Sequence, residues 1–308
     1  MNEYCAAIDL GTNTARLLIA KHSLGGLIPA HVERVVVRLG GGFTDEYGLS
    51  DDAQERALLC LQRFSDLIND YRVEKVIASA TSAVRDAVNG ADFVTNVFNR
   101  TGINLMVIDG NREAVLTFKG VLSGIDSDFD TLILLDVGGG STEFTVSSKG
   151  MPVFIKSMPI GVVRLTEGFS TVSLMKERIR DIIDQLESEL LSSGIDLSGG
   201  KEFIGTAGTA TTVAAIKLEM SNYDYRKVNN LKICRGDIEE IYQHLSRLSP
   251  SERLLIKGVE KGREDLIIAG MLIISAVMDK FGFEYMKVSD FGLLEGLALS
   301  LNESAAND

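Results

Sequence analysis

The sequence predicts an α/β protein built from two similar units. Strand-like and helix-like segments alternate along all 308 residues, a length that suits one large or two ordinary domains of roughly 100–200 residues each. The order of segments in the first half starts again in the second. Between the halves lies the polar, glycine-containing stretch 123–130, where we place the boundary between the units.

The first unit opens with β-branched, apolar segments that predict strands at 6–11, 15–21 and 32–39. Ser50 suits the N-cap of the next helix, in which the apolar residues repeat at helical spacing: Ala57, Leu58, Leu61, Phe64 and Leu67. We then expect strands at 75–80 and 103–109, and helices near 91–100 and 112–122.

The second unit follows the same plan. Three more strands are predicted at 131–137, 143–148 and 152–157, before a helix of about 20 residues from Ser173 to Ser193. The remaining segments predict strands at 201–205 and 285–290, and helices near 208–218, 236–247, 263–281 and 292–301.

Composition excludes several classes of protein. The formal net charge is −12, whereas nucleic-acid and anionic-membrane binders are basic, so we expect neither partner. The longest apolar stretch, 266–278, is short of the roughly 20 residues of a spanning helix, and no targeting segment is apparent, which favours the cytoplasm. Three scattered cysteines and three scattered histidines suggest neither a disulfide framework nor a zinc cluster.

A local pattern recurs in the two units. The chain reads DLGTNTARLLIA from position 9 and DVGGGSTEFTVS from position 136. Without a gap, Asp9 aligns with Asp136, Gly11 with Gly138, and Thr14 with Ser141. Because each pattern lies between two strands and a third strand follows, we interpret the pair as an internal duplication.

These two turns suit phosphate binding. Glycines allow a turn to direct several backbone N–H groups at one anion, and a small hydroxyl adds another donor. We therefore assign Gly11, Thr12, Asn13, Thr14, Gly138, Gly139, Gly140 and Ser141 to phosphate binding. The preceding Asp9 and Asp136 would hold Mg²⁺ or its waters. The alternative is a pair of ordinary hairpin turns whose aspartates accept from nearby amides.

Three further segments place polar groups after strands. The turn at 205–212 would put the amides of Gly208 and Thr209 at a helix N-terminus, which favours an anion, although small residues also allow close helix–sheet packing. Arg85 could bind a phosphate oxygen or pair with a carboxylate. Glu113 lies in the first turn of a helix, where an acid is commonly only a favourable dipole partner.

The ordered motifs resemble those of the exopolyphosphatase and guanosine pentaphosphate phosphohydrolase (Ppx/GppA) family, in its short two-domain form. The motifs cover essentially the whole chain: AIDLGTNTARLLIA (7–20), ATSAVRDAVNG (80–90), IDGNREA (108–114), LLDVGGGSTEF (134–144), MPIGVVRLTE (158–167), IGTAGTATT (204–212) and VSDFGLLEG (288–296). The resemblance implies two actin-like domains, each with a central mixed five-stranded sheet flanked by helices, and an active site in the cleft between them. One domain would comprise 1–122 and a C-terminal helix at about 295–308, the other 123–294.

The resemblance also implies roles for single residues. The family's catalytic base falls on Glu113, its conserved arginine on Arg85 and its magnesium- or water-binding aspartate on Asp136. We add Asp9 and Glu113 as further metal ligands, and Arg16 as a phosphate ligand. Two positions depart from the family pattern, since Arg112 replaces an acid beside the base and Leu294 replaces an arginine. A homodimer is also implied.

The expected function is magnesium-dependent release of orthophosphate from the end of inorganic polyphosphate. Glu113 would activate the attacking water. Catalysis would rest mainly on the positioning of the reactants and on stabilisation of the charge of the transferred group, as in other phosphoryl transfers. The alternative substrate is guanosine pentaphosphate (pppGpp). A small-molecule kinase of the same fold and a non-catalytic nucleotide- or polyphosphate-sensing module are kept as further alternatives.

Overall fold

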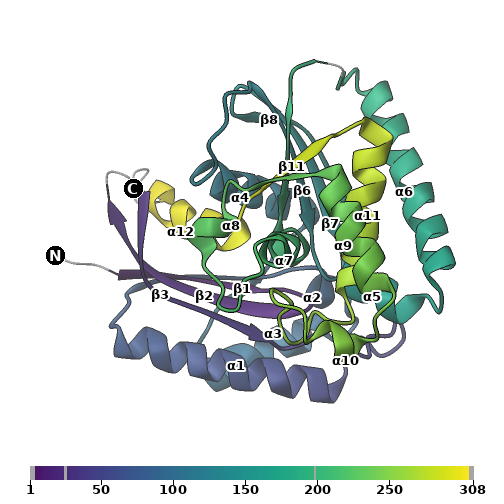
Figure 1. Cartoon of the computed structure of the whole chain (residues 1–308). Helices are drawn as coiled ribbons and strands as arrows, with labels where there is room; N and C mark the ends of the chain where they lie inside the picture. Colours follow the sequence, from purple (N-terminus) through teal and green to yellow (C-terminus); the bar gives the residue numbers. More distant parts are fainter. Residues whose placement is uncertain (1–3, 24–25, 198, 305–308) are drawn as a thin grey trace. The chain divides into compact units, whose positions relative to one another are not determined.

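The structure is a computed structural model that describes residues 4–23, 26–197 and 199–304 (Figure 1). The chain forms two compact units. Unit 2 is the continuous segment from Gly124 to Phe291, and unit 1 combines the chain up to Ser123 with the chain from Gly292 onward. Among the described helices, none is both long and apolar enough to cross a membrane.

Unit 1 contains a five-stranded mixed sheet in the order β3-β2-β1-β4-β5. β1 pairs antiparallel with β2 and parallel with β4. The strands are β1 (Tyr4–Leu10), β2 (Thr14–Ser23), β3 (Gly26–Val36), β4 (Lys75–Ala80) and β5 (Leu105–Val107). The helices are α1 (Asp51–Asp70), α2 (Ser82–Asp86), α3 (Gly90–Thr101), α4 (Gly110–Leu122) and α12 (Leu293–Ser304).

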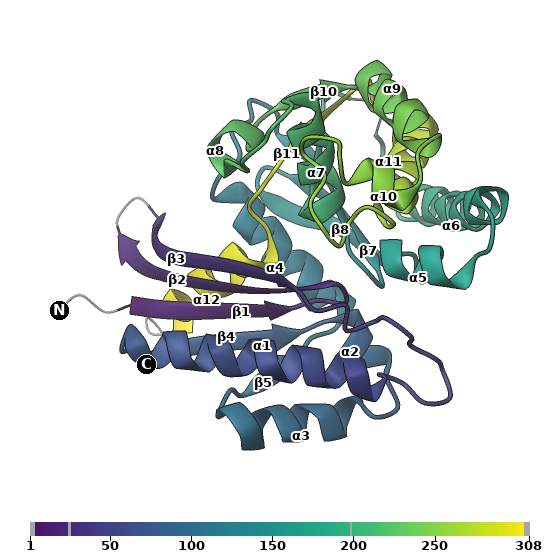
Figure 2. The ribbon, with the colours of Figure 1, turned by 60° about the horizontal axis from the view of Figure 1, so that its bottom comes forward.

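Helices cover both faces of this sheet (Figure 2). Successive strand residues point to opposite faces, so Ile8 of β1 packs in a cluster with Phe64 of α1 and Phe93 of α3. Its neighbour Ala7 packs in the other cluster, with residues of α4 and α12. The strand is buried on both sides, which explains why its residues from Cys5 to Ile8 are all apolar rather than alternating.

Unit 2 contains a six-stranded sheet in the order β10-β11-β9-β6-β7-β8. Its strands are β6 (Thr131–Val137), β7 (Thr142–Ser148), β8 (Met151–Met158), β9 (Glu202–Thr206), β10 (Lys232–Cys234) and β11 (Tyr285–Val288). Its helices are α5 (Val162–Gly168), α6 (Val172–Ser192), α7 (Ala207–Lys217), α8 (Tyr225–Val228), α9 (Arg235–Ser246), α10 (Pro250–Arg253) and α11 (Ile267–Phe281). The main core joins β6 to the apolar faces of α6 and α11, which lie side by side (Figure 1).

The two sheets share one topology. The order β3-β2-β1-β4-β5 corresponds to β8-β7-β6-β9-β11, with the same parallel and antiparallel pairs at each step. This correspondence supports the internal duplication that the two D-x-G patterns indicate. The prediction of five strands in each sheet is wrong for unit 2, because the short strand β10 adds antiparallel to the edge of β11.

Several local predictions also differ from the structure. β3 ends at Val36 rather than 39, because the amides of Val37 and Arg38 donate to the carbonyl of Asn13 at 3.0 and 2.9 Å. Ser50 is the N-cap of α1, but its hydroxyl donates to the carbonyl of Gly41 instead of capping the helix. The short elements α2, α5, α8, α10 and β10 were not predicted, since segments of three to seven residues show no clear periodicity.

Candidate active site

The two predicted phosphate turns are built alike, each within its own unit. In the first, the amide of Gly11 donates to the carbonyl of Thr14 at 3.0 Å. In the second, the amide of Gly138 donates to the carbonyl of Ser141, also at 3.0 Å. A Cβ at Gly138 would lie 2.8 Å from that carbonyl oxygen, so only glycine fits without a shift of the turn.

Closing each turn in this way leaves other amides available. In the part of the chain that the structure describes, no acceptor faces the backbone N–H of Thr12, Gly139 or Gly140. Buried amides normally have a partner, and Thr12 is 6% exposed. Successive N–H groups in a turn of this kind form an anion-binding concavity. The turns therefore have the donors that phosphate oxygens require.

Side chains brace both turns. The Thr12 hydroxyl lies 2.9 Å from the Ser82 hydroxyl at the start of α2, and Arg164 donates from Nε to the carbonyl of Gly140 at 3.0 Å. The Asn13 side chain is buried and donates to the Thr14 hydroxyl at 3.5 Å. The turns are thus held in place before any ligand binds, which lowers the entropic cost of binding.

In unit 1, Asp9 and Arg16 are brought together. They are cross-strand partners on β1 and β2, and Arg16 Nε lies 3.5 Å from Asp9 Oδ2. Arg16 also lies 3.9 Å from Glu295 of α12, whose carboxylate accepts from the amide of Gly292 at 2.8 Å. Burial raises the pKa of Asp9, and the Arg16 cation offsets part of that shift.

Arg85 and Glu113 also meet within unit 1. Glu113 lies in the first turn of α4 and is 8% exposed. Asp109 caps this helix by accepting from the amide of Arg112 at 2.8 Å. Arg85 Nη1 lies 3.4 Å from Glu113 Oε2 and donates to the carbonyl of Ile108 at 3.0 Å. Arg85 also contacts Asp86 at 3.5 Å, so it contacts carboxylates on α2 and α4.

In unit 2, Asp136 faces a residue that sequence analysis missed. Asp136 of β6 and Glu143 of β7 are direct cross-strand partners, so their side chains share one face of the sheet. Glu143 is 2% exposed, and the Ser157 hydroxyl donates to its Oε1 at 2.7 Å. The gapless alignment of the two patterns contained the signal, because it pairs Glu143 with Arg16 at the corresponding strand position.

The third turn is used for packing. Thr206 is the N-cap of α7, and its hydroxyl donates to the carbonyls of Ser289 and Phe291 at 3.0 Å each. A Cβ at Gly208 would lie 1.4 Å from the Arg263 guanidinium. Thr209 is buried against Gly270 of α11, where a Cβ would lie 2.1 Å from its hydroxyl. Gly208 and Thr209 therefore permit close approach inside unit 2, and their assignment to phosphate stays a prediction.

The two departures from the family pattern lie in different surroundings. Arg112 is exposed. Leu294 is 2% exposed and packs in the cluster of Ala7 and Leu297, so it contributes to the core at the position where the family pattern has an arginine. Among the described residues there is no group of three or more His, Cys, Asp or Glu side chains arranged to hold a metal.

The two mixed sheets and the helices that flank them define a protein of two actin-like units. The model of the Ppx/GppA phosphatase family matches residues 18–305, and the chain belongs to that family. This membership and its exopolyphosphatase relatives indicate a hydrolase acting on phosphoric anhydrides.

Relatives with curated names support the same class. The chain is 31% identical to exopolyphosphatase 2 of Mycobacterium tuberculosis over 96% of this chain and 98% of that protein. It is 33% identical to a bifunctional 3-dehydroquinate synthase/phosphatase of Fusobacterium nucleatum over 96% of this chain, but spans only 46% of that protein.

Solved structures of exopolyphosphatases and of the Ppx/GppA family have the same fold as this chain. An exopolyphosphatase from Cytophaga hutchinsonii superposes with a TM-score of 0.89 at 27% identity, covering 98% of each chain. The Aquifex aeolicus member of the Ppx/GppA family superposes with a TM-score of 0.80 at 27% identity, covering 100% of this chain and 99% of that one.

Proposed function

We propose that this protein is an exopolyphosphatase that removes the terminal phosphate of inorganic polyphosphate and releases orthophosphate. The observation that carries the proposal is the pair of equivalent turns. In both turns, the amide of the first glycine donates to the backbone carbonyl of the residue three positions later. Both turns also leave backbone amides without acceptors among the described residues. Each turn suits a substrate that carries a repeating row of phosphate oxygens.

Glu113 is the proposed general base. It accepts a proton from a water as the water oxygen attacks the terminal phosphorus, and the bond from phosphorus to the bridging oxygen breaks. Arg85 holds the Glu113 carboxylate from one side, so it acts here as a positioning residue. The products are orthophosphate and a polyphosphate shortened by one unit.

The residues present fit Mg²⁺ best at Asp136 and Glu143. Two acids placed directly opposite across a strand pair repel each other unless a cation lies near them, and Asp136 and Glu143 are placed in this way. Magnesium commonly takes one or two carboxylates and fills its other positions with waters and substrate phosphates. When bound, it would offset the negative charge of the phosphate oxygens. Asp9 and Glu113 have the cations of Arg16 and Arg85 beside them, which makes them poorer cation ligands.

The direct test is phosphate release with and without Mg²⁺ from three substrates, namely long-chain polyphosphate, pppGpp and ATP. We expect magnesium-dependent release to be fastest from polyphosphate. Faster release from pppGpp would replace the proposal with the guanosine pentaphosphate phosphohydrolase. Transfer of phosphate from ATP to an acceptor other than water would indicate a kinase, and tight binding without release would indicate a sensing module.

The variant Glu113→Gln tests the assigned base. It keeps the size of the side chain but removes its ability to accept the proton, so we expect kcat to fall by roughly 10²-fold or more with little change in KM. Glu74→Gln is the matched control, because Glu74 is exposed and directly precedes the first residue of β4. A Glu113→Gln enzyme with near-normal kcat would remove Glu113 from the mechanism.

A further inference from the structure

A row of three residues crosses the unit 2 sheet next to the second turn. Asp136 of β6 pairs with Glu143 of β7, and Glu143 pairs with Ser157 of β8. Directly paired residues of adjacent antiparallel strands project from the same face of a sheet, so these three side chains lie in line on one face. Glu143, in the middle, therefore has an acid on one neighbouring strand and a serine on the other.

The hydroxyl of Ser157 is bonded to this middle residue. It donates to Glu143 Oε1 at 2.7 Å, within the range of short hydrogen bonds to a charged oxygen. Glu143 is 2% exposed and Ser157 is half-buried. Since β7 lies between β6 and β8, the bond comes from the strand on the far side of Glu143 from Asp136. It fixes one carboxylate oxygen and so limits the rotation of the Glu143 side chain.

The corresponding row of unit 1 has different residues. Asp9, Arg16 and Arg34 pair in the same order across β1, β2 and β3. That row contains one acid and two bases, whereas the row of unit 2 contains two acids and a hydroxyl. Ser157 thus occupies the place of a base in the duplicated sheet. A neutral donor can hold a carboxylate without supplying a cation that would compete with Mg²⁺.

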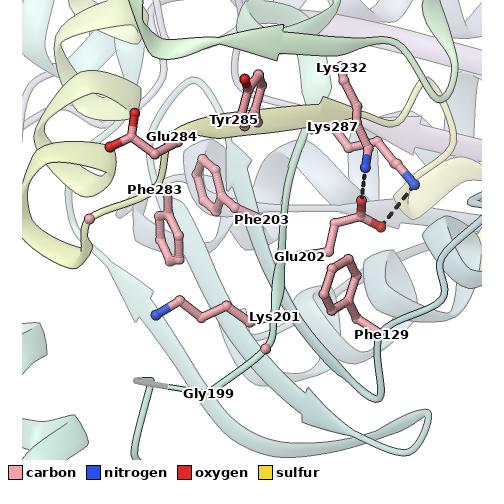
Figure 3. Close-up of a pocket in the computed structure, with 12 residues that line it drawn as sticks. Phe129, Gly199, Lys201, Glu202, Phe203, Lys232, Phe283, Glu284, Tyr285 and Lys287 are labelled. Carbon is pink, nitrogen blue, oxygen red and sulfur yellow. Dashed lines mark ion pairs between the residues drawn. The ribbon is translucent and has the colours of Figure 1, made fainter.

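A second buried glutamate of this sheet shows the contrast. Glu202, the first residue of β9, is 6% exposed and lies 2.9 Å from Lys287 and 3.0 Å from Lys232 (Figure 3). Two ammonium groups already neutralise this carboxylate, so a metal ion would gain little by binding it. Glu143 has an acid and a serine as its partners across the strands, which is the arrangement of a carboxylate held for a cation.

The backbone after β8 fixes Ser157 relative to the second turn. The amide of Val163 donates to the carbonyl of Gly139 at 2.8 Å, and a Cβ at Gly161 would lie 2.4 Å from the same oxygen. This segment therefore lies directly against the turn. Strand pairing on one side and this contact on the other leave Ser157 little freedom to move relative to Glu143.

We propose that Ser157 is a positioning residue for the metal-binding carboxylate of Glu143. Its hydroxyl holds that carboxylate in the orientation that binds Mg²⁺ jointly with Asp136. The inference rests on the proposed metal site at Asp136 and Glu143, but not on which phosphate compound the enzyme hydrolyses. Removing a hydrogen-bond partner of a metal ligand typically weakens metal binding by roughly 10–100-fold, and we expect an effect of this size for the Ser157 hydroxyl.

The test is binding of Mn²⁺ to the full chain without substrate. Mn²⁺ prefers the same oxygen ligands as Mg²⁺, and the electron paramagnetic resonance signal of the free ion gives its Kd. Ser157→Thr keeps the hydroxyl, whereas Ser157→Val puts a methyl group in its place, and both residues suit a strand. The Kd of Ser157→Val should be about 10–100-fold higher than that of Ser157→Thr, which should bind Mn²⁺ like the unchanged protein.

Two further variants define the site. Ser147→Ala is the matched control, because this buried serine of β7 donates to the carbonyl of Leu132 at 3.3 Å rather than to a carboxylate, and its Kd should be unchanged. Glu143→Gln should abolish Mn²⁺ binding at the site. Thermal melts without metal show that each variant is folded. High Mg²⁺ should restore phosphate release by Ser157→Val, because both carboxylates remain.

The outcomes separate this proposal from the metal site on which it rests. Equal Mn²⁺ affinity of Ser157→Thr and Ser157→Val would overturn the role of Ser157 and leave the metal site in place. Unchanged affinity of Glu143→Gln would overturn both. Because binding is measured without substrate, neither result depends on whether polyphosphate or another compound is hydrolysed.

Discussion

At the residue scale, the aligned aspartates meet different partners. Asp9 faces the cation of Arg16, whereas Asp136 faces a second acid, Glu143. The duplicated pattern thus combines an internally neutralised pair in unit 1 with a pair of acids in unit 2. The pair of acids in unit 2 is the place where we propose that Mg²⁺ binds.

Asp9 gives a prediction about stability and pH. Its pKa is raised in the folded state, so the folded protein holds this proton more tightly than the unfolded chain does. Between the ordinary aspartate pKa of about 4 and the raised value, this residue makes the free energy of unfolding fall as the pH rises. Asp9→Asn cannot ionise, and we expect its stability relative to the unchanged protein to increase with pH across that window.

Urea unfolding of both proteins between about pH 4 and pH 7 measures this difference. Only the difference matters, because other carboxylates titrate equally in both proteins. A relative stability of Asp9→Asn that falls with increasing pH would show that the pairing with Arg16 outweighs burial.

At the scale of elements, glycines set the contact between α4 and α12 in unit 1. A Cβ at Gly120 would lie 1.9 Å from the carbonyl oxygen of Gly292, and one at Gly296 would lie 1.8 Å from that of Leu116. The backbones of the two helices therefore touch directly. Since α4 carries Glu113 in its first turn, this contact also fixes the position of the proposed base.

Gly120→Ala tests the contact. The added methyl group has no space, so we expect a loss of about 1–3 kcal/mol of unfolding free energy together with a lower kcat. Gly168→Ala is the control, because a Cβ there meets nothing within 4 Å. Urea denaturation and phosphate release measure the two effects. Equal stability of the two variants would show that α4 and α12 can separate without cost.

Sequence analysis predicted the long, periodic elements and missed those defined by tertiary contacts. Helix α10 did carry a readable signal, since Ser249 and Glu252 form a capping box around Pro250. Strand β10 has no such sequence signal, because a segment of three residues with one buried side chain is too short to show the alternation of apolar and polar residues that marks a strand. The turns were predicted because glycine and hydroxyl residues are needed locally. The pair Asp9–Arg16 depends on strand register, and the pair Arg85–Glu113 joins residues 28 positions apart in the chain.

At the scale of the whole molecule, net charge predicts how salt changes the rate. The chain carries −12, and polyphosphate is a dense polyanion, so long-range repulsion slows their encounter. Salt screens this repulsion, with a Debye length of about 30 Å at 0.01 M and about 8 Å at 0.15 M. We expect kcat/KM for long polyphosphate to rise over this range at constant free Mg²⁺. A steep fall would show instead that basic residues attract the substrate.

The course of the chain has a practical consequence for engineering. Unit 2 is one uninterrupted segment, and its two ends meet, because a Cβ at Gly124 would lie 2.2 Å from the Phe291 ring. A segment whose ends adjoin can be excised or circularly permuted without stretching its backbone. A fragment of residues 124–291 could therefore be isotope-labelled by itself, and a short splice in its place would yield the complementary half for separate study.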